Sequence, residues 1–230
     1  MNRARSASPS TINANLRNHA LTAFLVLESL LLFIGAPLSA MGVHFPLFLG
    51  GLLVGPLLLA IVIISHSTGA RLLTLIAMVL AAGGIAFRIN HPSPMSVWLG
   101  HLAVIAAFLG ISVVIVQAVF APGRITHHRI EGAVILYLNI ALVFTSIYRL
   151  IQELDPEAFT HIPARQVEVE AMSNMLYFSF TTLTSTGFGE ILPVDPFARS
   201  MANLESVVGQ LYLAILLARL VTMHVESRRH

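Results

Sequence analysis

The sequence predicts an all-α membrane protein with six transmembrane helices, and its composition and hydropathy pattern both support this fold class. Hydrophobic residues make up 56% of the 230 residues, whereas charged residues make up only 10%. The mean hydropathy is +0.82. A water-soluble domain of this length could not cover its surface with so few charges. The apolar residues form six runs, and each run approaches the length of about 20 residues that crosses a bilayer as a helix.

The composition also argues against other classes of protein. The 13 basic residues are all arginine, and most lie between or beside apolar runs, so they form no basic patch for nucleic acid. Cysteine is absent, which excludes disulfides, thiolate metal sites and a cysteine nucleophile. There is no HExxH, GxSxG or Walker-type motif, and the two halves do not look like the repeats of a transporter. We therefore expect neither an enzyme nor a bound cofactor.

Four of the apolar runs follow an N-terminal tail at residues 1–19. They predict a four-helix transmembrane domain over residues 20–120, with spans at 21–43, 45–65, 72–87 and 95–120. The first run could instead be a signal peptide, but it contains Glu28 and exceeds the apolar core of about 7–15 residues typical of such peptides. We expect a retained helix. The fourth run lacks the regularly spaced arginines of a voltage sensor.

The arginines predict the orientation of the chain. Those on one side of the membrane precede the first span, follow the second, precede the fifth and end the chain: Arg3, Arg5, Arg17, Arg71, Arg124, Arg129, Arg228 and Arg229. By the positive-inside rule, we expect both termini to be cytoplasmic, in the cell (inner) membrane. The opposite side carries residues 152–173, where five acids against one arginine give a net charge of −4. Such a segment would attract cations.

A cytoplasmic linker at residues 121–131 is expected to lead into a second domain at 132–223. This domain has an outer span at 132–151 and an inner span at 200–223, followed by a short cytoplasmic tail at 224–230. Between the spans, residues 174–184 place aromatic side chains on one side and Thr or Ser on the other. This segment is too short to cross a membrane, and Ser173 is a candidate N-cap residue. We therefore expect a re-entrant helix.

The residues after this segment, Ser185 to Gly189, read STGFG. Irregular backbone at membrane depth is stable only where it is buried in protein or lines a wet cavity. Glycine adopts left-handed conformations easily, and alternating left- and right-handed residues would turn successive carbonyls the same way. A ring of such carbonyls can replace the hydration shell of a cation. The segment is therefore suited to line a path for a cation.

Residues 181–190, TTLTSTGFGE, resemble the pore loop of the tetrameric potassium channel superfamily, whose filter reads TVGYG within TTxTTVGYGD. Pro193 and Arg199 lie where that family often has Pro and Arg. Gly209 lies where many members have the hinge glycine of the inner helix. Residues 129–138 look like the start of the outer helix in bacterial relatives with a two-helix pore domain. The resemblance implies a passive, potassium-selective homotetramer in membrane lipids, with K⁺ as the permeant ion and no attached ligand-binding domain.

The resemblance also implies roles for individual residues. The ion-binding residues of the filter would be Ser185, Thr186, Gly187, Phe188 and Gly189. Filter support would come from Tyr177, Thr181, Thr184 and Glu190, and we expect Glu190 to accept a hydrogen bond from Tyr177 or Thr181. A gate is expected on the inner helix at Gly209 and at the helically spaced Leu213, Leu217 and Val221, which would close the cavity by dewetting.

The filter departs from the family pattern at Ser185, Thr186 and Phe188, which predicts a somewhat softer filter. A weakly selective monovalent cation channel and a non-conducting, pore-like subunit therefore stay as alternatives to potassium selectivity.

Two intramembrane acids also require partners, because an unpaired charge in a membrane is costly. We expect Arg149 to pair with Glu205 and Arg71 to pair with Glu28.

Overall fold

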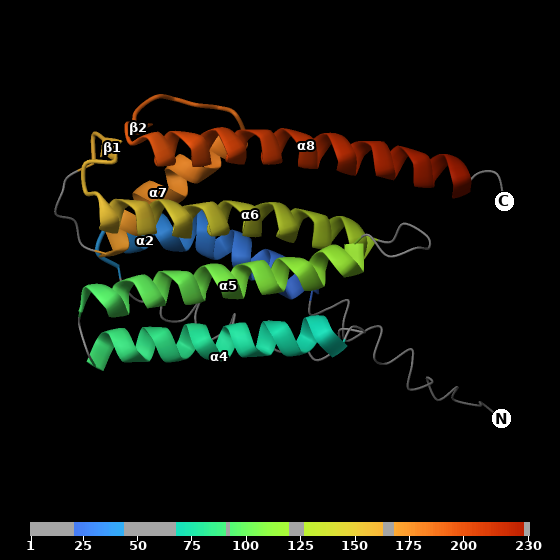
Figure 1. The fold of residues 1–230 in the computed structure, drawn as a ribbon. Coiled ribbons are helices and arrows are strands. Elements are labelled where there is room, and N and C mark those ends of the chain that lie inside the picture. Colours follow the sequence, from blue (N-terminus) through green and yellow to red (C-terminus); the bar gives the residue numbers. More distant parts are fainter. Residues whose placement is uncertain (1–20, 44–67, 91–92, 120–126, 163–167, 228–230) are drawn as a thin grey trace.

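The computed structural model describes residues 21–43, 68–90, 93–119, 127–162 and 168–227, and this part of the chain is mostly helical (Figure 1). Four helices are long and apolar enough to cross a membrane: Leu21–Ala40, Met95–Gln117, Arg129–Leu154 and Pro196–Arg219. They correspond to the predicted first, fourth, fifth and sixth spans. The predicted second span, 45–65, lies outside the described residues. The chain is therefore a multi-pass membrane protein.

The first span is a helix with an irregular second half. It contains a π-helical turn, η1 (Leu31–Gly35), and ends as α2 (Ala36–Ala40). Pro37 follows this turn, and because proline cannot donate a helical hydrogen bond, the regular ladder is interrupted there. At its other end, Thr22 donates a hydrogen bond of 3.0 Å to the Glu131 carboxylate. This helix therefore contacts the helix that contains Glu131.

The next two described helices, α4 (Thr68–Asn90) and α5 (Pro94–Val119), lie side by side at one edge of the molecule (Figure 1). α4 contains the predicted third span and runs past both flanking arginines, as expected. The start of α5 is capped reciprocally. The Ser93 Oγ accepts the Ser96 N–H at 3.2 Å, and the Ser96 Oγ accepts the Ser93 N–H at 3.0 Å. This exchange satisfies donors that a helix start otherwise leaves unpaired.

The central helix is α6 (His127–Leu154), which contacts α5, α7 and α8. Within its most apolar window, 67% of the residues are buried. The helix already begins at His127, so the last five residues of the predicted linker are helical. Its contact with α5 is close at Gly132, where an added Cβ would lie 2.9 Å from a methyl group of Val119. α6 therefore lies in contact with α5 as well as with α7 and α8.

The segment after α6 contains a strand, β1 (Phe159–Thr160), and the short helix α7 (Glu168–Leu183). A loop leads from α7 to β2 (Leu192–Pro193), and β2 pairs antiparallel with β1, with Phe159 opposite Pro193. α7 extends further toward its N-terminus than predicted, so Ser173 lies inside the helix and is not its N-cap. The residues before Ser173, EVEAM, include good helix formers, which favours this extension.

The last helix, α8 (Pro196–Ser227), starts at a strong cap. Asp195 Oδ1 accepts the Ala198 N–H at 2.8 Å, and Pro196 occupies the first helical position. The start of α6 and the end of α8 lie at one end of the molecule, while β1 and β2 lie at the other (Figure 1). Only 11% of the residues in the apolar window of α8 are buried, so most of this helix is uncovered in the single chain.

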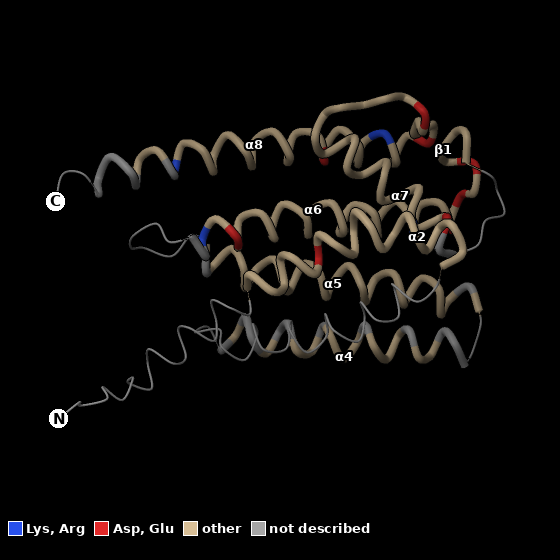
Figure 2. The backbone as a smooth tube through the Cα atoms, turned by 180° about the vertical axis from the view of Figure 1, so that it is seen from behind, with Lys and Arg blue, Asp and Glu red and all other residues tan. Residues whose placement is uncertain are grey.

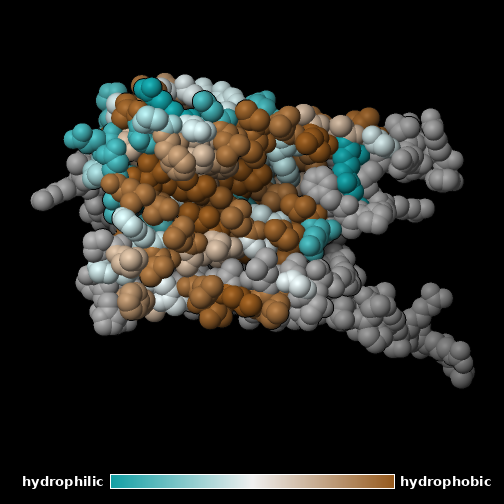
Figure 3. Space-filling model, in the orientation of Figure 1, coloured by the Kyte–Doolittle hydropathy of each residue, from teal (hydrophilic) through white to brown (hydrophobic). Residues whose placement is uncertain are grey.

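The surface separates into an apolar band and a polar end. Hydrophobic side chains cover the middle of the helices, and hydrophilic ones gather at the end that carries the two strands (Figure 3). Acidic residues are concentrated at this same end (Figure 2). The described members include Glu153, Asp155 and Glu157. An apolar band flanked by a charged end is the surface expected of a protein that crosses a bilayer.

Candidate functional site

The site begins where α7 ends and its chain turns into the loop. The Ser185 N–H donates to the Thr182 carbonyl at 2.9 Å, which ends the helix in a tight turn. The next two N–H groups, those of Thr186 and Gly187, both donate to the Thr181 carbonyl, at 2.8 and 3.1 Å. One carbonyl near the end of α7 therefore holds two successive peptide groups of the loop against the helix.

The backbone of the loop is left-handed at every second residue. Ser185, Gly187 and Gly189 have φ angles of 55°, 54° and 83°. Thr186 and Phe188, which lie between them, are not among the residues with positive φ. Glycine adopts positive φ without steric cost, whereas Ser185 does so against a preference of about 1–2 kcal/mol. This alternation was expected from the positions of the two glycines, and it extends one step further, to Ser185.

The first two carbonyl groups of the loop, those of Ser185 and Thr186, point away from α7. In a planar trans peptide, the N–H of one residue and the C=O of the preceding residue point in opposite directions. Because the N–H groups of Thr186 and Gly187 are directed at α7, the carbonyls of Ser185 and Thr186 are directed to the opposite side. Within the described part of the chain, none of the carbonyls from Ser185 to Gly189 accepts a hydrogen bond. They form a row of unpaired acceptors on an exposed loop.

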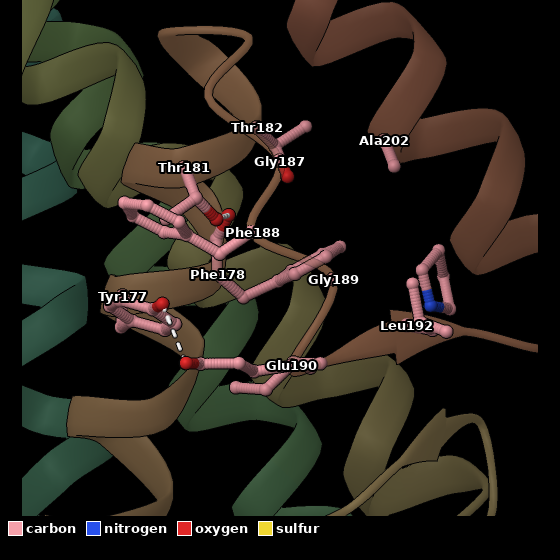
Figure 4. A pocket seen from close by; sticks show the side chains of 12 residues that line it. Tyr177, Phe178, Thr181, Thr182, Gly187, Phe188, Gly189, Glu190, Leu192 and Ala202 are labelled. Atoms are coloured by element: carbon pink, nitrogen blue, oxygen red, sulfur yellow. Dashed lines mark hydrogen bonds between the residues drawn. The ribbon is translucent and has the colours of Figure 1, made fainter.

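A second set of contacts holds the outer end of the loop. The Tyr177 hydroxyl donates to Glu190 Oε2 at 2.7 Å (Figure 4). The rings of Tyr177 and Phe188 stack with centroids 6.3 Å apart and planes 5° apart. The hydrogen bond to Glu190 is the main cause that raises the pKa of Tyr177, so the phenol keeps its proton. Of the two donors considered for Glu190, the structure has Tyr177. Thr181 instead donates to the Phe178 carbonyl.

A cavity of about 160 Å³ lies behind this outer part of the loop (Figure 4). It is lined by residues of α7, the loop, β2 and α8, including Tyr177, Phe188, Glu190 and Ala202. His161, which follows β1, contacts the backbone of Glu190. Its Nδ1 lies 3.0 Å from the Glu190 carbonyl, so that nitrogen carries the proton in this contact. The outer end of the loop is thus fixed through Glu190 on both its side chain and its backbone.

The inner end of the loop is held by α8 through residues that sequence reasoning missed. Gln210 Nε2 donates to the Ser185 Oγ at 3.0 Å, and the Ser206 Oγ donates to the Thr182 carbonyl at 3.2 Å. Within the loop, the hydroxyls of Thr184 and Thr186 are 2.8 Å apart. Ser206 and Gln210 are four residues apart and therefore share one side of the helix. In the sequence, this four-residue spacing on either side of Gly209 was the signal that both side chains face the same neighbour.

Gly209 lies where α8 comes closest to the end of α7. An added Cβ would lie 2.1 Å from the Leu183 carbonyl oxygen and 3.0 Å from its carbon. α8 is helical on both sides of this residue. The glycine is therefore required for close packing in this structure, and its predicted role as a hinge stays a prediction.

Glu205 is fully buried, but its partners are not the predicted one. Its carboxyl group lies 2.6 Å from the Tyr148 hydroxyl of α6 and 2.5 Å from the Ser179 hydroxyl of α7. The expected pair with Arg149 is wrong. The Arg149 guanidinium binds Gln152 at 2.6 Å and Glu153 at 2.7 Å on its own helix. Glu205 therefore joins three helices through neutral hydroxyl groups.

Glu28 also differs from expectation. Its Oε1 lies 3.3 Å from Asn139 Nδ2 of α6, and its buried Oε2 has no hydrogen-bond partner among the described residues. The side chain of Arg71, its predicted partner, lies outside the described residues.

The predicted gate residues Leu213, Leu217 and Val221 all lie on α8, with exposed fractions of 41%, 63% and 62%. The single chain thus leaves this stripe uncovered.

Among the described residues, no group of three or more His, Asp or Glu side chains lies close enough together to hold a metal ion. The acceptors that the site offers are therefore backbone carbonyls and hydroxyls. Such neutral oxygens suit a weakly held monovalent cation better than a tightly bound divalent one.

Comparison with known proteins agrees with this geometry. Residues 133–226 match the family model described as "Ion channel". Protein LctB of Bacillus caldotenax is 32% identical over 87 residues, which are 37% of this chain and 64% of LctB. No solved structure matches the chain. The matched region holds α6, α7, the loop and α8. Residues 133–226 are therefore a two-helix ion channel domain of the potassium channel superfamily.

Proposed function

We propose that this chain forms a passive, potassium-selective channel in which the backbone carbonyls from Ser185 to Gly189 coordinate the permeant ions. The observation that carries the proposal is the row of unpaired carbonyls from Ser185 to Gly189, of which the first two are directed away from α7. Backbone acceptors without a partner are expensive in a membrane, unless water or an ion satisfies them. A dehydrated K⁺ ion has the charge that such dipoles can stabilise. In this proposal α7 is the re-entrant pore helix and the loop is the selectivity filter.

A single loop offers acceptors on one side of an ion, so we propose that four copies surround the conduction axis. Two features of the single chain support this arrangement. The filter residues are exposed, and the apolar stripe of Leu213, Leu217 and Val221 on α8 has no cover. A closed ring of identical chains would bring both features to the axis. The acidic residues near β1 would then surround the outer mouth and raise the local cation concentration.

The contacts around the filter favour potassium over an unselective pore. The filter is held at its outer end by Tyr177 and Glu190, at its inner end by Gln210, and from behind by the Thr181 carbonyl. A fixed backbone keeps the number and spacing of the carbonyls constant, and both bear on selectivity. The serine at position 185 retains the hydroxyl of the family threonine, and Gln210 orients it.

The test is flux through the purified protein reconstituted in liposomes. We expect a potassium gradient to drive flux well above that of a sodium gradient, and Gly187→Asp to abolish both. Equal flux through the Gly187→Asp protein would refute the filter assignment, and equal potassium and sodium flux would leave a weakly selective cation channel. Absence of flux in every preparation would favour a non-conducting subunit.

The number of subunits is tested by mixing wild-type chains with Gly187→Asp chains. If one defective filter strand blocks a tetramer, liposomes made with equal amounts of wild-type and Gly187→Asp chains should retain about one sixteenth of the wild-type flux per channel. Retention of about half would mean that each chain conducts independently.

A further inference from the structure

The buried Glu205 carboxyl group has a hydrogen-bond pattern that requires an extra proton. The Ser179 Oγ lies 2.5 Å from Glu205 Oε1 and also 2.8 Å from the Ala141 carbonyl oxygen. A serine hydroxyl has one proton and can donate one strong hydrogen bond at a time. The Ala141 carbonyl can only accept. The two short oxygen–oxygen distances therefore need two protons, and the serine supplies one.

The second proton can come only from the carboxyl group. Tyr148, which contacts the other oxygen at 2.6 Å, uses its single proton on Oε2. A protonated Glu205 donates from Oε1 to the Ser179 Oγ, and Ser179 then donates to the Ala141 carbonyl. With this assignment each of the three hydroxyl protons lies between two oxygen atoms. An ionised Glu205 would leave the 2.8 Å contact between Ser179 and Ala141 without a proton.

The surroundings of Glu205 favour the same neutral form. Glu205, Tyr148 and Ser179 are all completely buried. The titratable groups that face the carboxyl from α6 are Tyr148, in contact, and Tyr137, further away. From α7 it faces Ser179, and among the described residues no arginine or histidine pairs with it. A buried carboxylate without a cation is strongly disfavoured relative to the protonated acid.

We propose that Glu205 is protonated at neutral pH and that its carboxyl group is a proton-dependent latch that holds the pore helix α7 between α6 and α8. This inference rests on the proposed channel function for its effect on conduction, but its structural part is independent of that function. Ser179 lies on the same helix as Thr181 and Thr182, whose carbonyls bind the start of the filter. Loss of the proton would break the contact between Ser179 and Ala141 and place an uncompensated charge among the three helices. The filter would lose its rear support.

The experiment combines infrared spectroscopy with flux measurements on the full-length protein in liposomes. We expect the wild type at neutral pH to show the carbonyl stretching absorption of protonated carboxylic acids, and Glu205→Gln to lose the part that Glu205 contributes, whereas the part from the buried Glu28 should remain. Ser179→Ala removes the acceptor of the carboxyl proton, so it should shift the Glu205 band to higher wavenumber. The matched control is Glu157→Gln, which changes an exposed acid outside the latch and should leave the band unchanged.

Flux supplies the second measurement. When the pH rises from about 7 to about 10, wild-type flux should fall at least about tenfold, the equivalent of one lost buried hydrogen bond. Glu205→Gln keeps a neutral group that donates to Ser179, so its flux should stay constant over this range. Absence of the Glu205 contribution to this absorption in the wild type, or an unchanged pH dependence in Glu205→Gln, would overturn the proposal. If no protein conducts, the proposed function fails while the infrared result still decides the protonation of Glu205.

Discussion

Replacement of Gly209 by alanine would put a methyl group against the backbone at the end of α7. The added Cβ would lie 2.1 Å from the Leu183 carbonyl oxygen, whereas ordinary contact begins at 3.4 Å. α8 and the end of α7 would have to separate by about 1.3 Å, since the obstacle is backbone and cannot rotate away. The separation would fall between Ser206, which binds the end of α7, and Gln210, which binds the Ser185 hydroxyl.

The free-energy cost follows from two opposing effects. Overpacking against a rigid neighbour costs about 3 kcal/mol, the upper end of the usual range. Alanine is a better helix former than glycine and recovers about 1 kcal/mol. The net loss of about 2 kcal/mol per subunit corresponds to a factor of about 30 in the population of the intact pore domain. A hinge role alone would predict altered gating with little change in stability.

The assay is thermal unfolding of the detergent-solubilised protein together with liposome flux. Gly209→Ala should lower the unfolding temperature and reduce potassium flux. The matched control is Gly83→Ala in α4, where nothing lies within 4 Å of the added Cβ, so stability should be equal or slightly higher. If Gly209→Ala unfolds and conducts like the wild type, the close contact with Leu183 does not exist in the functional protein.

Three further predictions concern the filter and the gate. Leu217→Ser should raise basal flux, because a hydroxyl in a dewetted constriction favours water; unchanged open probability would argue against this gate. Glu190→Gln weakens the charge-assisted bond from Tyr177, so conduction should decay faster during sustained flux, and a time course equal to the wild type would exclude the bracing role. Ser185→Thr adds the methyl group that stiffens the family filter, so the potassium-to-sodium flux ratio should rise; a lower ratio would contradict our account of the softer filter.

The helical fold could be predicted from the sequence because long apolar runs leave few alternatives in a membrane. Four of the six predicted spans correspond to helices of membrane-crossing length and hydropathy, and α4 contains a fifth. The helix ends were less accurate, since Ser173 proved to lie inside α7. Good N-cap residues also occur within helices, and the favourable residues before Ser173 decided the outcome.

The geometry of the site was predictable where it depends on local sequence. Alternating φ and the Tyr177–Glu190 bond follow from the order of residues within one loop and helix. The partner of Glu205 was not predictable in this way. Tyr148 and Arg149 are neighbours on α6, but successive helical residues point about 100° apart, so the choice depends on how α6 is rotated relative to α8. Charge complementarity favoured Arg149 as the partner of Glu205, but the packing of α6 on α8 places Tyr148 in that position instead.

The polar contacts of the ion channel domain share one feature: mostly neutral groups hold the loop that we propose as the filter. Around the filter, hydroxyl, amide and backbone groups supply the contacts at its inner end and rear, and Glu190 at the outer mouth is the described exception. A fixed charge beside the inner sites would bind a monovalent cation too tightly or repel it, and conduction requires weak binding at several sites. A protonated Glu205 fits this requirement, because it gives α8 two strong hydrogen bonds without adding a charge close to the ion path. An arginine partner would have satisfied the acid equally well, but would have brought a permanent positive charge behind the pore helix.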